Sequence, residues 1–173
     1  LDDPRGVVVA DGKVFVSEYG NDRLSVFSLG GVFSHCIGSG RGADPGQLSN
    51  PFRFAVSDGL VFVSDGDNDR VSVFRVDGTF VRVFGDPGDG DGEFNGPCDV
   101  AVVGERVFVA DWQNNRVSVH RLDGEFVRSF THDKLGTPNG LTVVGDRLFV
   151  TDDSNHVVHT TCSPDHRFMH TVA

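Results

Sequence analysis

The fold is decided by a stretch that runs from Val107 to His120 and reads VFVADWQNNRVSVH. Close copies read VFVSEYGNDRLSVF at 14–27 and VFVSDGDNDRVSVF at 61–74, and a weaker copy covers 148–157. Between the three close copies, the arginine shifts by 47 and then by 46 residues. A fixed period of this length, built from short apolar stretches, is typical of a repeat architecture.

Each copy lies inside a longer unit of four predicted strands. A proline opens each unit, at positions 4, 51, 97 and 138, and proline suits the first residue of a strand because no ladder donor is needed there. A tight turn of glycine and acidic residues then leads into the second strand. That strand is apolar at consecutive positions, which predicts burial on both faces. The third strand alternates apolar and polar residues, and a second turn leads to the fourth.

Four antiparallel strands per unit, at a period of about 40–50 residues, are typical of a propeller blade. The sequence therefore predicts an all-β fold, a β-propeller with four four-stranded antiparallel blades in an open or partial ring. We expect one propeller segment over 1–173, with blades at about 4–47, 51–94, 97–134 and 138–173.

The repeated motifs also carry a family resemblance. They are Pro-x-x-x-Ala-Val, Val-Phe-Val-Ser-Asp, Asn-Asp-Arg-Val-Ser-Val-Phe and Asp-Gly-x-Phe-Val-x-x-Phe-Gly, followed by Gly-x-Gly-Glu-Phe. Together they resemble the NHL repeat, over essentially the whole chain. The usual closed form of that family has six blades, so four repeats imply a partial ring. The resemblance further implies a binding or scaffold module within a larger multidomain protein, with protein ligands and, in some members, RNA ligands.

A second function stays open because similar six-bladed propellers include metal-assisted lyases and hydrolases. Their sites lie in the central channel, at the residues just after the blade prolines. By resemblance these residues are Arg5, Phe52, Arg53, Cys98, Asp99 and Asn139. They lack the cluster of histidine and carboxylate ligands that such a site requires. The sequence leaves enzymatic activity uncertain and favours its absence, with no catalytic residue, no metal ligand and no cofactor expected.

The composition indicates which kinds of partner and compartment to expect. The net charge of −10 argues against an extended nucleic-acid surface, which needs a positive field, and favours a protein partner. No stretch approaches the roughly 18 consecutive apolar residues of a membrane span. The three cysteines form no CxxC pair, which favours a reducing compartment such as the cytoplasm. The chain starts without methionine, so we expect a piece of a longer polypeptide, with missing blades or self-association covering its ends.

The repeated arginines, Arg23, Arg70 and Arg116, each follow an acid by five residues. We interpret them as structural, each reaching from the third strand to the carboxylate on the second strand or to backbone carbonyls. An anion-binding ring of arginines is the alternative.

The fourth unit departs from the pattern. Its Asp152–His156 spacing is one residue shorter than Asp111–Arg116, which places His156 at the arginine position and His159 at that of a core valine. Its second turn, at 163–166, lacks Asp-Gly, so we expect this blade to be the loosest.

The chain's single tyrosine and single tryptophan, Tyr19 and Trp112, are 93 residues apart. They therefore occupy the same position in the first and third blades, where Gly66 and Asp153 stand in the other two. This position follows the second strand, so both rings are expected on one rim of the propeller. Aromatic residues of this kind anchor binding surfaces, although packing on a neighbouring blade is an equal alternative. The candidate ligand-binding residues are Tyr19, Trp112, Arg5, Phe52 and Arg53.

Overall fold

The computed structural model describes residues 1–131, 135–145, 147–161 and 169–171, and in these ranges the chain is all-β. Sixteen strands are found there. The first eight are β1 (Pro4–Ala10), β2 (Lys13–Glu18), β3 (Arg23–Ser28), β4 (Phe33–Ile37), β5 (Pro51–Ser57), β6 (Leu60–Asp65), β7 (Arg70–Arg75) and β8 (Phe80–Phe84). The second eight are β9 (Pro97–Val103), β10 (Arg106–Asp111), β11 (Arg116–Arg121), β12 (Phe126–Phe130), β13 (Pro138–Val144), β14 (Arg147–Asp152), β15 (Val157–Thr161) and β16 (Met169–Thr171). Short 3₁₀ turns, η1 (Tyr19–Asn21) and η2 (Gly66–Asn68), follow β2 and β6.

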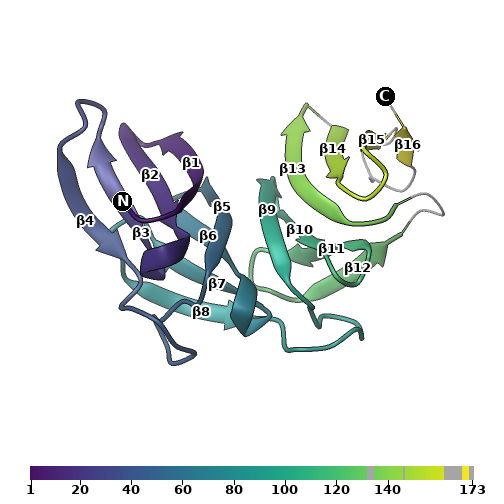
Figure 1. The fold of residues 1–173 in the computed structure, drawn as a ribbon, viewed down its shortest axis with the longest axis horizontal. Coiled ribbons are helices and arrows are strands. Elements are labelled where there is room, and N and C mark those ends of the chain that lie inside the picture. Colours follow the sequence, from purple (N-terminus) through teal and green to yellow (C-terminus); the bar gives the residue numbers. More distant parts are fainter. Residues whose placement is uncertain (132–134, 146, 162–168, 172–173) are drawn as a thin grey trace.

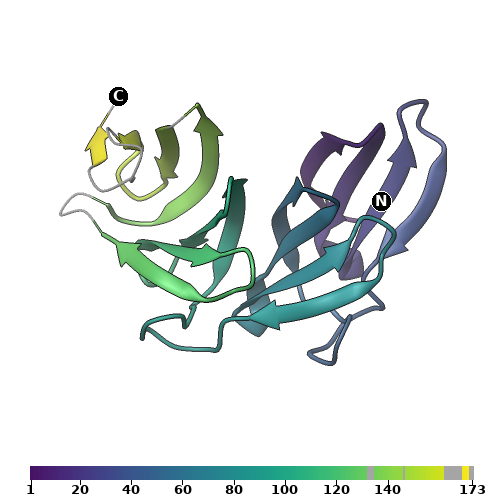
Figure 2. The ribbon, with the colours of Figure 1, turned by 180° about the vertical axis from the view of Figure 1, so that it is seen from behind.

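The strands form four antiparallel four-stranded sheets, each in simple sequential order from β1–β4 to β13–β16. We call these sheets blades 1 to 4. The first strands of successive blades, β1, β5, β9 and β13, contact one another and so line the inner side. Figures 1 and 2 show the blades along an arc, with blade 1 and blade 4 at its two ends. The prediction of a four-bladed propeller that is not closed into a ring is confirmed.

Three apolar clusters hold neighbouring blades together. Between blades 1 and 2, Phe15 and Leu24 pack with Phe54 and Val63, and equivalent clusters join blades 2 and 3 and blades 3 and 4. The second strand of each inner blade lies between two such clusters, which explains its continuous burial from the second residue onward. Burying each large apolar side chain contributes about 1.5–3 kcal/mol, so these junctions provide the main stabilisation of the arc.

The outer side of blade 1 has no neighbouring blade. Val7 and Val9 of β1 are 67% and 64% exposed, whereas the corresponding strand β9 of blade 3 is buried over its first five residues. The expectation that further blades or self-association cover this face stays a prediction.

Within the described ranges, no helix has the length and hydrophobicity that crossing a bilayer requires.

The alignment predicted for blade 4 is wrong. Asp152 pairs with Val157, and His159 pairs with Val150, so Val157 occupies the place that Arg116 has in blade 3. His156 instead adopts a left-handed backbone with φ of 57°. The same conformation is taken by the residue just before each arginine, namely Asp22, Asp69 and Asn115. No residue is missing from this loop. The predicted turn at 163–166 lies outside the described residues, and the looseness of blade 4 stays a prediction.

Candidate functional site

A buried carboxylate ends the second strand of every blade, at Glu18, Asp65, Asp111 and Asp152. We call this the acid position. In blades 1 to 3 an arginine Nε donates to the carboxylate, at 3.0, 2.8 and 2.7 Å respectively. The guanidinium of Arg116 also donates to backbone carbonyls of the preceding linker, those of Asp89, Gly90 and Glu93. The structure thus contains the acid–arginine contacts that the sequence predicted.

The acid position collects donors from several elements. Burial alone would raise the pKa of Glu18, but hydrogen bonds from Ser25, Asn21, Arg23 and the Asp2 amide lower that pKa to about 2. The carboxylate therefore stays ionised and joins the end of β2 to β3 and to the N-terminal segment.

In blade 4 the buried carboxylate of Asp152 receives its hydrogen bonds without an arginine. His159, which is fully buried, lies 3.1 Å from the Asp152 carboxylate. Hydrogen bonds from Asn155, the Gly136 amide, His159 and Ser154 outweigh the effect of burial and hold the pKa of Asp152 well below its usual range. His159 is thus a partner of the acid, in the place that Ser25 and Ser72 have in blades 1 and 2, and it does not replace a core valine.

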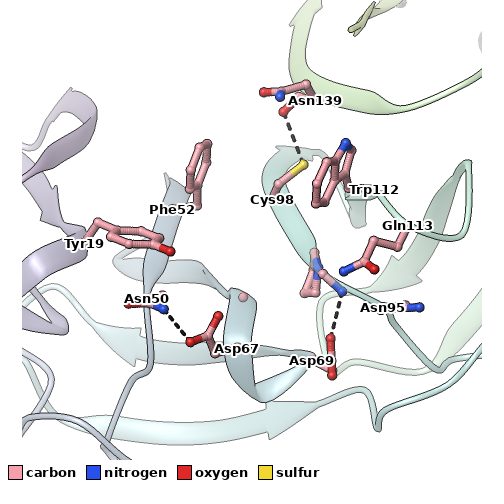
Figure 3. Close-up of a pocket in the computed structure, with 13 residues that line it drawn as sticks. Tyr19, Asn50, Phe52, Asp67, Asp69, Asn95, Cys98, Trp112, Gln113 and Asn139 are labelled. Carbon is pink, nitrogen blue, oxygen red and sulfur yellow. Dashed lines mark hydrogen bonds between the residues drawn. The ribbon is translucent and has the colours of Figure 1, made fainter. Parts of the chain in front are cut away.

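The residue after the acid position is Tyr19, Gly66, Trp112 or Asp153 in the four blades. We call this the rim position. The rim residues of blades 1 to 3 line one cavity of about 540 Å³, which we call the rim cavity. Phe52 and Asn139, from the inner strands of blades 2 and 4, also line it. In Figure 3, Tyr19 and Phe52 stand on one side of the cavity and Trp112 stands on the other.

The predicted residues on the Tyr19 side of this cavity also contact one another. Tyr19 and Phe52 meet edge to face with ring centroids 6.2 Å apart. The guanidinium of Arg5 stacks over both rings, at 5.0 and 5.4 Å. Arg53 lies 5.7 Å from the Phe52 centroid and donates to the carbonyl of Asn139 at 3.0 Å. The structure therefore gathers all five candidates around one region, with Tyr19, Phe52 and Trp112 lining the cavity.

Sequence reasoning missed the polar residues of the rim cavity. Asp67 and Asn50 are hydrogen-bonded to each other (Figure 3), and Asp69 accepts from the Gly96 amide at 2.7 Å. Asp69 belongs to the left-handed residues that precede the arginines, and Asn50 directly precedes a blade proline. These two recurring positions could have identified Asp69 and Asn50, whereas the position of Asp67 reads Gly20, Gln113 and Ser154 in the other blades and gave no signal.

The residues after the later blade prolines connect blades 3 and 4. The buried Cys98 thiol lies within hydrogen-bonding distance of the Pro138 and Asn139 carbonyls, and burial raises its pKa to about 12. Asp99 accepts from the Leu141 amide at 2.7 Å, and burial raises its pKa to about 6 despite hydrogen bonds and the nearby Arg53. Among the residues that the structure describes, no three His, Cys, Asp or Glu side chains are grouped to hold a metal ion.

Solved structures of several different proteins have this fold. Virginiamycin B lyase from Staphylococcus aureus superposes with a TM-score of 0.74 at 16% identity, over 97% of this chain and 54% of the lyase. Hydrazine synthase from Kuenenia stuttgartiensis gives 0.78 at 15% identity, over 99% and 50%. A chain of a nidogen/laminin complex gives 0.79 at 23% identity, over 98% and 64%. At these identities the likeness shows the fold alone, and the chain spans only about half to two thirds of those proteins.

Comparison of the sequence with known proteins and protein families identifies a family to which the chain belongs. No curated protein matches the chain. A family described as a 6-bladed beta-propeller matches residues 44–136, which is more than half of the 173 residues. The matched segment runs from the linker before blade 2 almost to the first strand of blade 4, β13. The chain therefore belongs to this family of 6-bladed β-propellers.

Proposed function

We propose that this chain is an NHL-type recognition module of a larger multidomain protein, and that its rim cavity binds a protein partner. One observation carries the proposal. The rim position varies from blade to blade, yet its residues Tyr19, Gly66 and Trp112 come together at a single cavity. The proposal takes 1–173 as one propeller segment, with the blade boundaries expected from the sequence.

The chemistry of the cavity supports a protein ligand. Trp112 remains 40% exposed, and large aromatic side chains at the centre of an interface commonly provide 2 kcal/mol or more of binding free energy. Loops on a rigid scaffold are the usual location of binding residues, and the blade junctions supply such a scaffold. The nidogen/laminin complex contains a chain of this fold, which is compatible with recognition of another protein.

The two alternatives have less support. For RNA, the relevant cations would be Arg5 and Arg53, and both already stack on aromatic rings of the chain. The net charge of −10 also opposes phosphate binding. For a lyase or hydrolase, the channel residues Cys98 and Asp99 are engaged with backbone groups of blade 4. Both residues act there as links between blades.

The proposal is tested by comparing two aromatic truncations in quantitative pull-downs from an extract of cells that express the parent protein. Trp112→Ala removes a wall of the rim cavity, whereas the matched control Phe33→Ala removes a 55% exposed ring from the outer strand of blade 1. We expect proteins captured by the wild-type chain to be lost with Trp112→Ala and kept with Phe33→Ala. Equal capture by both variants would contradict the proposal.

A further inference from the structure

We infer that the rim cavity receives a basic side chain, lysine or arginine, carried by an extended segment of the protein partner. Its cation would lie between the ring of Trp112 and the carboxylate of Asp67. The inference rests on the proposed function and adds the chemical class of the ligand.

The charge of the cavity is the first argument. Among the described residues that line it, the charged side chains are Asp67 and Asp69, and none is lysine or arginine. Asp69 already accepts from the Gly96 amide, which joins blade 2 to blade 3. Arg5 and Arg53 lie against Phe52 on one side, so the carboxylates of the opposite, blade 2 loop are where a cation is favoured over an anion, in line with the acidic character of the whole chain.

Asp67 has the capacity to accept a ligand. Its side chain is 47% exposed, and its only ionic contact in the described part of the chain is with Arg41 at 3.7 Å, which is itself 69% exposed. Exposed pairs of this kind contribute about 0–1 kcal/mol, so a cation held in the cavity can replace Arg41 at small cost. In Figure 3, Asp67 lies at the base of the cavity, between the Tyr19 side and the Trp112 side.

The aromatic rings are the second argument. Cations prefer the faces of Trp, Tyr and Phe rings, and the chain already uses this interaction where Arg5 covers Tyr19 and Phe52. Across the cavity, Trp112 is 40% exposed, and no arginine or lysine of the described residues stacks on it. The partly exposed indole of Trp112 is thus an aromatic ring of the cavity to which a partner's cation can be added.

The size and polar lining of the cavity argue for a peptide segment. A volume of about 540 Å³ lies within the range of ordinary ligand pockets and exceeds what one side chain fills. Three residues with amide side chains, Asn95, Gln113 and Asn139, are also among its lining residues, and the Asn139 amide oxygen already accepts from Arg53. Each amide carries both donors and an acceptor, which suits the N–H and C=O groups of an extended backbone on either side of the basic residue.

The test is selection of binders from a phage-displayed library of random linear peptides on the full chain. The best peptide is then measured by fluorescence anisotropy against wild type, Asp67→Asn and the matched control Asp58→Asn. Asp58 lies in the exposed turn between β5 and β6 of the same blade, so the control changes the net charge equally. We expect enriched peptides to share a lysine or arginine. Asp67→Asn, or replacement of that basic residue by norleucine, should weaken binding at least about ten-fold, while Asp58→Asn leaves it unchanged.

Two outcomes separate the inference from the proposed function. Peptides that bind in a Trp112-dependent way, but carry no basic residue or bind Asp67→Asn as tightly as wild type, would overturn the inference and leave the proposed function intact. Absence of enrichment, or binding that survives Trp112→Ala unchanged, would overturn the proposed function and the inference with it.

Discussion

Two neighbouring positions, the last residue of the second strand and the residue after it, behave in opposite ways. The acid position holds a fully buried carboxylate in blades 1 to 3, and each blade joins it to an arginine. The next residue, at the rim position, changes from Tyr19 to Gly66 to Trp112 and lies at a cavity. A position with the same contacts in every blade serves the scaffold, whereas a position that varies on an unchanged scaffold is available for a ligand.

Blade 4 shows which part of the acid position is constant. Asp152 keeps its buried carboxylate although Val157 stands where the other blades have arginine. His159 and Asn155 satisfy Asp152 instead. The constant feature is thus a buried carboxylate with several donors, and arginine is one of the ways to supply them.

The largest effect on stability is expected for Arg116→Ala. The Arg116 side chain is 9% exposed, and its partner Asp111 is fully buried. Asp111 keeps hydrogen bonds from the Asn95 amide and Asn114, but the variant loses the buried ion pair and the three bonds of Arg116 to linker carbonyls. Breaking a buried pair costs about 3–5 kcal/mol, measured as the free energy of unfolding in urea. Arg121→Ala is the control because its pair with Glu125 is exposed on both sides and should contribute less than about 1 kcal/mol. Equal, small losses for both variants would remove the distinction between scaffold and surface arginines.

A smaller effect, with a defined pH dependence, is expected for Glu18→Gln. The folded-state pKa of Glu18 is about 2, below the ordinary value of 4.5. The carboxylate therefore contributes stability that is fully present above the ordinary value and is lost as the pH falls through about 2. We expect the variant to be less stable by about 2–3 kcal/mol near neutral pH. Urea unfolding should show this deficit shrinking as the pH falls from 4.5 towards 2, whereas a deficit independent of pH would mean that Glu18 acts through packing alone.

A still smaller effect is expected for Arg23→Ala. Its side chain is 40% exposed, and Glu18 keeps the hydrogen bonds from Ser25 and Asn21 when the arginine is lost. The free energy of unfolding should fall by about 1 kcal/mol. A loss as large as that of Arg116→Ala would show that the contribution of these arginines to the free energy of unfolding does not depend on how exposed they are.

Much of this fold could be predicted because the same pattern of strands and turns occurs in three close copies. The Val-Phe-Val stretches predicted buried second strands, and the acid–arginine spacing predicted ion pairs that the structure contains. The register of blade 4 was wrong because the arginine that marks this position in the other blades is replaced by Val157, and the basic residue beside it, His156, is the left-handed residue of the loop.

The polar lining of the cavity could not be predicted for a different reason. Asn50 and Asp67, which touch within the cavity, lie in different loops of blade 2, and the curvature of the arc brings them towards Gln113 of blade 3. That curvature follows from how the apolar clusters fill the space between blades, which no local pattern encodes. The residues of one loop position are visible in a sequence, but the distances across a blade junction are not.

The central claim is that the rim position serves binding and the acid position serves the scaffold. Trp112→Ala tests it most directly, with thermal unfolding and affinity for the selected peptide measured on the same preparation. The account predicts at least about a ten-fold loss of affinity with a change in unfolding free energy below about 1 kcal/mol. A melting temperature lowered by several degrees, together with unchanged affinity per folded molecule, would show that Trp112 packs between blades and that the partner binds elsewhere.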